Sequence, residues 1–180
     1  GWASVSVKRA VSQASRIRPS SGMSGAEAAA RILSAAGLDH VGIEQTQGFL
    51  GDHYDPRKKV LRLTPEIYQG RTLAAVGVAA HEVGHAVQDA RAYAPLALRN
   101  GLVPMASVGS NLSWVLLVAG MFLQSANLMF AGIVVFSVTV LLQIINLPVE
   151  FNASSRAREL LVDHGILMRS EMAPVSKVLN

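Results

Sequence analysis

The feature that most constrains the fold is an uncharged stretch of 49 residues, 101–149, which holds no Asp, Glu, Lys, Arg or His. A helix needs about 20 apolar residues to cross a bilayer, so this stretch has room for two spans. We predict them near 103–123 and 128–147, separated by a polar break at 124–127. The alternative is a pair of helices buried in a soluble core. The rest of the chain, however, is too short to enclose two helices of this apolarity.

Positive charge flanks this stretch on both sides. Arg91 and Arg99 precede it, Arg156 and Arg158 follow it, and the break between the two expected spans carries no charge. Because cytoplasmic loops of membrane proteins are enriched in Lys and Arg, we expect both flanks in the cytoplasm and the break outside. The basic residues form neither a long helical stripe nor an aromatic-interleaved surface, so nucleic-acid binding is not expected.

A further basic cluster lies near the start of the chain, where Lys8, Arg9, Arg16 and Arg18 stand among apolar residues. Two interpretations fit this pattern. One is an interfacial helix that lies along the membrane surface, and the other is a solvated tail.

The pentapeptide H-E-V-G-H at 81–85 indicates a metal site. It lies in a stretch, 73–93, that we predict as one helix because no proline interrupts it. Positions i and i+4 lie on one helix face, so His81 and His85 can bind one metal ion while Glu82 reaches a metal-bound water, as in zinc peptidases. The chain has no cysteine, so its metal ligands must be His and carboxylate. Two hydrogen-bonded histidines on a half-buried helix are the alternative, which explains poorly three polar side chains on an Ala- and Val-rich surface.

A hydrolytic zinc ion takes three protein ligands and one water, so a third ligand is needed. Glu150 is the strongest candidate because it is the first charge after the uncharged stretch, and a carboxylate at a membrane boundary is costly unless it is paired. His53 and His164 are alternatives. Glu150 could also simply mark the boundary and pair with Arg158 or solvent. Asp89 lies about 12 Å along the helix from the first histidine, at ~1.5 Å per residue, which is too far for a shared ion.

The residues before the motif predict a small α+β arrangement. Residues 24–27 form a capping box, S-G-A-E, that opens an Ala-rich helix ending at Gly37. Two strands are expected at 41–47 and 59–63, with a turn-rich loop at 48–57 between them. An exposed edge of such a sheet can bind a substrate backbone as an added strand beside the metal.

Four segments carry a resemblance to a known family: 24–27, 52–57, 77–86 and 148–154. In these segments the chain resembles the YugP-like membrane-bound neutral zinc metallopeptidases, and the resemblance covers nearly all of it. The resemblance implies a zinc-dependent membrane peptidase with His81 and His85 as ligands and Glu82 as base. By likeness to the broader class of glutamate-ligand zinc peptidases, it also implies Glu150 as the third ligand.

One position departs from the pattern of that broader class. Its members often have an aspartate four residues after the ligand glutamate, where it supports a metal-binding histidine, whereas this chain has Ser154. Either Asp89 or Asp163 supplies that support, or the alignment at Glu150 is shifted. The family also has further membrane segments at both ends, so the natural protein is expected to be longer.

The predicted architecture is an α+β membrane protein: a mostly helical, zincin-like head with a small sheet, joined to a transmembrane helical hairpin. The chain is expected to divide into four parts. They are a basic juxtamembrane segment with a linker, the head, the hairpin, and a C-terminal helix that supplies the third ligand, at 1–22, 23–100, 101–149 and 150–180.

The predicted function is that of a zinc metalloendopeptidase with one Zn²⁺ per chain, in which Glu82 acts as general base on a metal-activated water. Two alternatives are an intramembrane metalloprotease and a non-catalytic scaffold in which zinc only pins the head to the hairpin. Tyr54, His53 and Arg156 are candidates for stabilising the oxyanion.

The expected partners are a peptide or protein substrate and the lipid bilayer, without nucleic acid. We expect an integral protein of the bacterial inner membrane with its catalytic head on the cytoplasmic side. The sequence identifies neither the substrate nor the oligomeric state.

Overall fold

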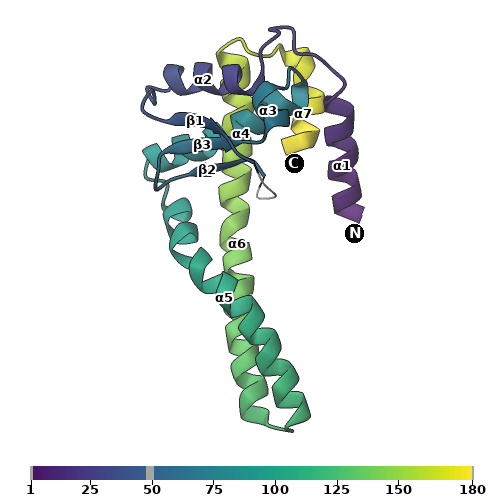
Figure 1. The fold of residues 1–180 in the computed structure, drawn as a ribbon, viewed down its shortest axis with the longest axis vertical. Coiled ribbons are helices and arrows are strands. Elements are labelled where there is room, and N and C mark those ends of the chain that lie inside the picture. The colour runs from purple at the N-terminus through teal and green to yellow at the C-terminus, as the bar shows by residue number, and fades with distance from the viewer. Residues whose placement is uncertain (1, 48–50, 180) are drawn as a thin grey trace. The chain divides into compact units, whose positions relative to one another are not determined.

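The computed structural model describes residues 2–47 and 51–179, in which helices dominate and the strands form one small sheet. The chain forms two compact units, residues 1–91 with 151–180, and residues 92–150. The expected division into four parts stays a prediction. The helices and strands, shown in Figure 1, are in chain order α1 (Trp2–Ala14), α2 (Gly25–Ala35), β1 (Gly42–Gln45), β2 (His53–Asp55), β3 (Val60–Leu63), α3 (Pro65–Gln69), α4 (Leu73–Ala90), α5 (Ala94–Phe122), α6 (Ala126–Asp163), η1 (Arg169–Glu171) and α7 (Met172–Leu179).

The three strands form a sheet in the order β1–β3–β2, with β1 parallel and β2 antiparallel to β3. β1 and β3 lie within the two segments predicted as strands. The prediction of a plain loop at 48–57 is wrong at its centre, because β2 occupies His53–Asp55. Residues 48–50 of that segment lie outside the described residues.

The sequence of strand β2 has no apolar pattern, and polar contacts stabilise the strand instead. The Tyr54 hydroxyl donates to Asp89 Oδ2 at 2.7 Å, and the guanidinium of Arg62 donates to Asp55 Oδ2 at 2.8 Å. Backbone pairing with β3 adds to these contacts. Such a strand has no alternation of apolar and polar residues from which it could be recognised.

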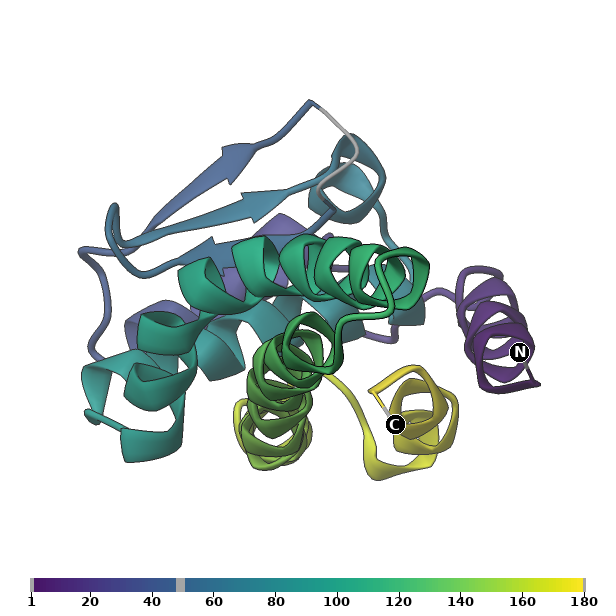
Figure 2. The same cartoon turned by 90° about the horizontal axis from the view of Figure 1, so that it is seen from below.

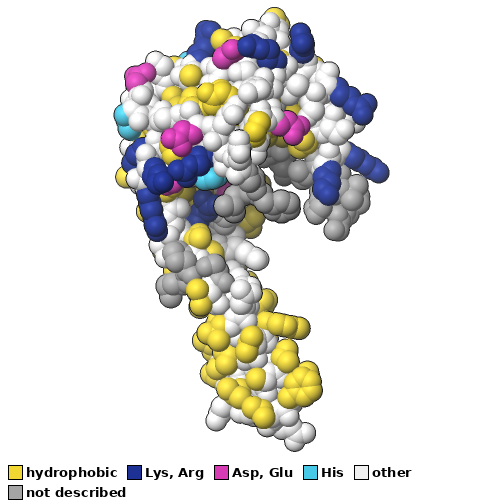
Figure 3. Space-filling view, viewed as in Figure 1, with side chains coloured by type: hydrophobic (Ala, Val, Ile, Leu, Met, Phe, Trp, Pro, Cys, Tyr) yellow, Lys and Arg dark blue, Asp and Glu magenta, His cyan; other side chains and the backbone are white. Residues whose placement is uncertain are grey.

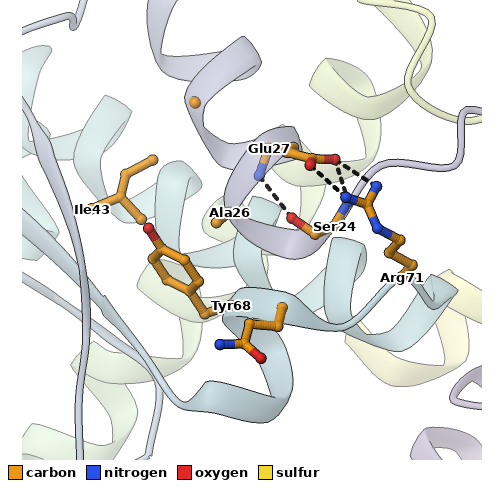
Figure 4. Close-up of a pocket in the computed structure, with 8 residues that line it drawn as sticks. Ser24, Ala26, Glu27, Ile43, Tyr68 and Arg71 are labelled. Atoms are coloured by element: carbon orange, nitrogen blue, oxygen red, sulfur yellow. Dashed lines mark hydrogen bonds and ion pairs between the residues drawn. The ribbon is translucent and has the colours of Figure 1, made fainter.

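Helix α2 begins with the predicted capping box. The Ser24 hydroxyl accepts a hydrogen bond from the Glu27 N–H at 3.2 Å, and the Glu27 carboxylate accepts one from the Ser24 N–H at 2.9 Å. Figure 4 shows that Arg71 also donates to Glu27, at the rim of an open groove that Ile43 and Tyr68 help to line. The bonds from Arg71, followed by that from Ser24, hold the pKa of Glu27 below its usual value. One carboxylate thus caps α2 and fastens the segment before α4 to it.

The first unit has its own hydrophobic core. Helices α2 and α4 pack against each other and contact the sheet, and α7 packs against α4. Burying a Leu or Ile side chain stabilises a fold by about 1.5–3 kcal/mol, so this core fixes α4 in position. The largest fully buried apolar side chains are Ile32, Leu61, Leu63, Leu73, Leu161 and Ile166.

Helix α1 packs against α7, as Figure 2 shows, and also contacts α4. Ala14 is fully buried and Ala10 nearly so, so the face of α1 that holds these residues lies on protein. The interpretation of this segment as a solvated tail is therefore wrong for α1. The interfacial interpretation stays a prediction.

The second unit is a helical hairpin built from α5 and the first part of α6. Residues 123–125 connect the two helices, and Gln124 has φ of 51°. A break is thus present as predicted, but the last two residues of the predicted range, 126 and 127, already belong to α6. A side chain at Gly132 would meet Leu117 Cγ at 2.8 Å, so glycine lets the helices approach closely. Figure 3 shows apolar side chains over the end of this hairpin that holds its turn. The exposed large apolar residues include Trp114, Phe122, Phe130, Ile133, Phe136 and Leu141.

One helix of the described part, α6, is long and apolar enough to cross a membrane. Only 6% of its most apolar stretch of 18 residues is buried. Helix α5 passes the same test only if its two parts, 94–103 and 108–122, are taken together across a bend of 51°. Pro104 lies at this bend and has no N–H for the helical hydrogen bond. The described part of the chain thus contains one candidate span, α6. It contains a second one if the two parts of the bent helix α5 are taken as a single span.

Candidate metal centre

Helix α4 places the predicted metal ligands. It begins after Thr72, whose hydroxyl accepts a hydrogen bond from the Ala75 N–H at 3.2 Å. Its Ala- and Val-rich sequence has no proline, and most of its residues are buried. It ends at Ala90 rather than at Tyr93 as predicted, because Ala92 adopts a left-handed φ of 50°.

The two histidines of the motif face each other one turn apart on α4. Their ring centroids lie 4.8 Å apart at an interplanar angle of 86°. His85 is buried, and His81 is partly exposed. The separation and the edge-to-face angle place both rings at the same side of the helix, as two ligands of one ion require.

Ser154 determines which nitrogen of His81 carries the proton. The Ser154 Oγ lies 3.1 Å from His81 Nδ1 and 2.8 Å from the carbonyl oxygen of Leu179. A hydroxyl has one hydrogen, and the Leu179 carbonyl can only accept it. Ser154 must therefore accept the hydrogen bond from His81, so Nδ1 carries the hydrogen and Nε2 keeps the lone pair that a metal needs.

A second chain of hydrogen bonds has the same effect on His85. Its Nδ1 lies 3.0 Å from Gln88 Oε1, and the Gln88 amide nitrogen donates to Asn152 Oδ1 at 3.0 Å. Arg156 Nε donates to the same Asn152 oxygen at 2.7 Å. Because the Gln88 amide nitrogen faces Asn152, its oxygen faces His85, which must donate. Both histidines therefore carry the hydrogen on Nδ1 and keep a lone pair on Nε2.

Close packing of α4 against residues 151–157 of α6 brings these partners together. A side chain at Gly84 would meet the carbonyl oxygen of Ala153 at 2.6 Å, which is shorter than any real contact of a Cβ. Ala153 and Ala157 are fully buried. The glycine inside the motif thus lets Asn152 and Ser154 reach the two histidines.

Glu82, the predicted base, is 8% exposed, and its Oε2 accepts a hydrogen bond from the backbone N–H of Tyr54 at 3.0 Å. Tyr54 belongs to β2, an edge strand of the sheet. Its hydroxyl donates to Asp89, which also accepts from Lys59 Nζ at 2.5 Å. Burial, followed by the hydrogen bond to Asp89, raises the pKa of Tyr54, so this hydroxyl stays protonated. This contact network fixes β2 next to the base.

Glu150 joins the two histidines in a group that could bind a metal ion. One ligand atom from each of His81, His85 and Glu150 lies within 4.8 Å of the other two. Among the described residues, His53 and His164 are not members of this group. Two imidazoles and a carboxylate suit zinc in a hydrolytic site. Because Nδ1 of each histidine donates a hydrogen bond, the lone pair of each ring is on Nε2, where a metal ion could bind it. The donor set therefore fits zinc.

The remaining candidates from the sequence have other contacts. His53 Nδ1 lies 3.2 Å from the carbonyl of Gly51, and Asp89 binds Tyr54 and Lys59. Ser154, which stands where the resemblance led us to expect an aspartate, itself contacts His81. Gln88 and Asn152 were missed by the sequence reasoning. The position of Gln88, three residues after His85 on a helix otherwise apolar around the motif, is the signal that could have found it.

Removing the Ser154 hydroxyl should weaken zinc binding. Loss of a hydrogen-bond partner of a metal-binding histidine costs about 10–100-fold in metal affinity, so we expect a rise of this size in the zinc Kd of Ser154→Ala. Competition with a fluorescent chelator measures the Kd. Ser155→Ala, one residue further along α6, is the matched control and should bind zinc like the wild type. Equal affinities for the two variants would contradict the role of Ser154.

The comparisons with known proteins identify the family of the chain. The model of the family described as "Putative neutral zinc metallopeptidase" matches residues 1–180. The chain is 45% identical to "Putative membrane protease YugP" of Bacillus subtilis (strain 168) over 179 residues, which cover 99% of this chain and 80% of that protein. No solved structure matches. The chain belongs to the family of neutral zinc metallopeptidases that this model describes.

Proposed function

We propose that this protein is a zinc-dependent metalloendopeptidase, with one Zn²⁺ per chain bound by His81, His85 and Glu150. The observation that carries the proposal is the hydrogen-bonding of both histidines, which leaves each Nε2 as a ligand atom on the same side of α4. A pair of merely structural histidines would not need a common tautomer. The family of the chain supports the same chemistry.

Continuity of helix α6 supports Glu150 as the third ligand. Glu150 stands four residues, or about one helical turn, before Ser154. Since Ser154 contacts His81, a residue one turn earlier on the same helix face is near the histidine pair. Arg99 Nη2 lies 3.6 Å from the Glu150 carboxylate, so a positive charge stands beside the proposed ligand.

The side chains of the site account for the acid–base chemistry of peptide hydrolysis. When bound, zinc supplies a Lewis acid that polarises the scissile carbonyl and lowers the pKa of water toward ~7. Glu82 accepts the proton of the attacking water and later donates it to the leaving amine. The N–H of Tyr54 fixes one oxygen of Glu82, so the carboxylate does not need to reorient for proton transfer.

The proposed substrate is a peptide or protein segment in an extended conformation. Edge strand β2 contacts Glu82 through Tyr54, so a backbone that follows this edge would bring its scissile bond to the base. Two candidates for stabilising the oxyanion already make other hydrogen bonds. The Tyr54 hydroxyl donates to Asp89, and Arg156 Nε donates to Asn152.

Hydrolysis of an unfolded protein substrate tests the proposed function. We expect the purified chain to cleave it, a chelator to abolish cleavage, and one equivalent of Zn²⁺ to restore it, since the three proposed ligands provide one site. Release of new amino groups measures the rate. Cleavage that survives complete removal of metal would rule out the proposal, and so would zinc-loaded protein that never cleaves.

We further propose that the protein is integral to the bacterial inner membrane, with its catalytic head in the cytoplasm. Helix α6 and the name of the Bacillus relative support the membrane location, and the basic flanks support the orientation. The polar contacts of the described metal centre with Gln88, Asn152 and Arg156 favour a site in water over an intramembrane one.

Cysteine labelling tests the orientation, because the chain has no cysteine of its own. Gln124 lies in the turn between α5 and α6, and Lys58 lies in the turn before β3; both are exposed. We expect an impermeant maleimide to label Gln124→Cys in intact bacteria and Lys58→Cys only after permeabilisation. Labelling of Lys58→Cys in intact cells would contradict the orientation.

A further inference from the structure

A groove of about 360 Å³ lies between α1 and α7, in the first unit and apart from the metal centre. Ala10, Ile17, Ala173 and Pro174 provide most of its apolar lining. Ile17 is 42% exposed, although its side chain is large and apolar. The groove thus presents carbon surface to solvent.

Two cations, Arg16 and Lys177, also line this groove, one from each side. Both are exposed, and within residues 2–47 and 51–179 neither takes part in an ion pair. Their charge is therefore available to a ligand.

The surroundings of the groove add positive charge. The sequences of α1 and α7 contain no acidic residue, and Lys8, Arg9 and Arg18 lie on or just after α1. Figure 3 shows basic side chains gathered over the N-terminal helix. The carboxylate of Glu171, just before α7, is already occupied by hydrogen bonds from Ser20 and Met168. Nothing in α1 or α7 neutralises the two cations, so the groove favours an anion.

We propose that this groove binds the headgroup of an anionic phospholipid. The cations Arg16 and Lys177 contact the phosphate, and the apolar lining contacts the glycerol and the first acyl carbons. Arginine suits this role because its guanidinium binds phosphate oxygens in pairs. A site for free phosphate needs no apolar lining, whereas a lipid does, and candidate span α6 brings the chain to lipids.

Native mass spectrometry of the full chain in detergent, titrated with phosphatidylglycerol, tests the proposal. We expect one phosphatidylglycerol per chain, bound more tightly than phosphatidylcholine. The double variant R16Q/K177Q should weaken it by about tenfold or more, because each basic residue near a lipid surface contributes about fivefold. The matched control R31Q/K58Q removes one arginine and one lysine from exposed positions outside the groove and should bind like the wild type.

A third variant separates the cavity from the charge. Ala173 is exposed, so Ala173→Phe fills the groove without disturbing the core, and it should weaken phosphatidylglycerol as strongly as the loss of both cations. Equal losses in the two double variants would show general charge attraction and overturn the proposal. So would unchanged binding by Ala173→Phe, or displacement of the lipid by an equal concentration of inorganic phosphate, which would identify a site for the free anion.

Discussion

Glu82→Gln should bind zinc with near wild-type affinity and hydrolyse peptides about 10²–10⁴-fold more slowly, which is the usual contribution of a general acid–base group. Glutamine has the same shape and keeps an oxygen that can accept the hydrogen bond from the Tyr54 N–H. It cannot, however, take a proton from water at neutral pH. The loss should therefore appear in kcat, with the fold and the metal content retained.

Zinc content, thermal unfolding and steady-state kinetics together measure this prediction. Glu66→Gln is the matched control, because Glu66 is exposed on α3 and outside the metal centre; it should keep full activity. If Glu82→Gln turned over at the wild-type rate with zinc bound, the assignment of the base would be wrong.

Glu150→Ala should lose zinc. With one of three protein ligands removed, the two histidines remain on α4, but the ion lacks the carboxylate that offsets its charge. A structural zinc site in a peptide is worth about 10–16 kcal/mol at pH 7, so the loss of a ligand should lower the affinity by several orders of magnitude. We expect the purified variant to contain less than a tenth of an equivalent of zinc, and to be inactive.

Glu159→Ala, nine residues further along α6 and exposed, removes the same charge outside the metal centre. It should keep one zinc per chain. If both variants retained zinc equally, Glu150 would not be a ligand, and the remaining candidates His53 and His164 would have to be tested in its place.

The local features of this fold are readable from the sequence because they depend on neighbours along the chain. The capping box at Ser24 needs only a partner three residues away, and the pairing of His81 with His85 needs only one helical turn. The break between α5 and α6 shows as polar residues in an apolar stretch. In each case, spacing alone determines which side chains can meet.

The contacts that complete the metal centre were not readable, because they join distant parts of the chain. Gln88 meets Asn152 across 64 residues, and His81 meets Ser154 across 73. These meetings depend on the close approach of two helices at Gly84. The pattern of the broader peptidase class favoured an aspartate as the partner of a ligand histidine, whereas a serine hydroxyl, itself oriented by a backbone carbonyl, takes that place here.

Two further errors concern a missed strand and the end of a helix. Strand β2 is stabilised by polar contacts with α4 and by pairing with β3, so its own residues carry no strand pattern. Helix α4 ends at Ala90, three residues before the predicted end at Tyr93. Ala92 adopts a left-handed φ just after it, which an alanine rarely does. At β2 the tertiary contacts outweigh the local preference.

The most direct test of the metal centre is X-ray absorption at the zinc edge of the wild-type protein, purified without chelators. The proposed site predicts one zinc per chain with two imidazole nitrogens at about 2.0–2.1 Å and oxygen ligands in the remaining positions. A peptide thiol inhibitor should displace one of those oxygens, a water, and put a sulfur ligand at about 2.3 Å in its place. Protein that carries no zinc, or zinc enclosed by four protein ligands with no exchangeable oxygen, would contradict the peptidase and leave a structural site.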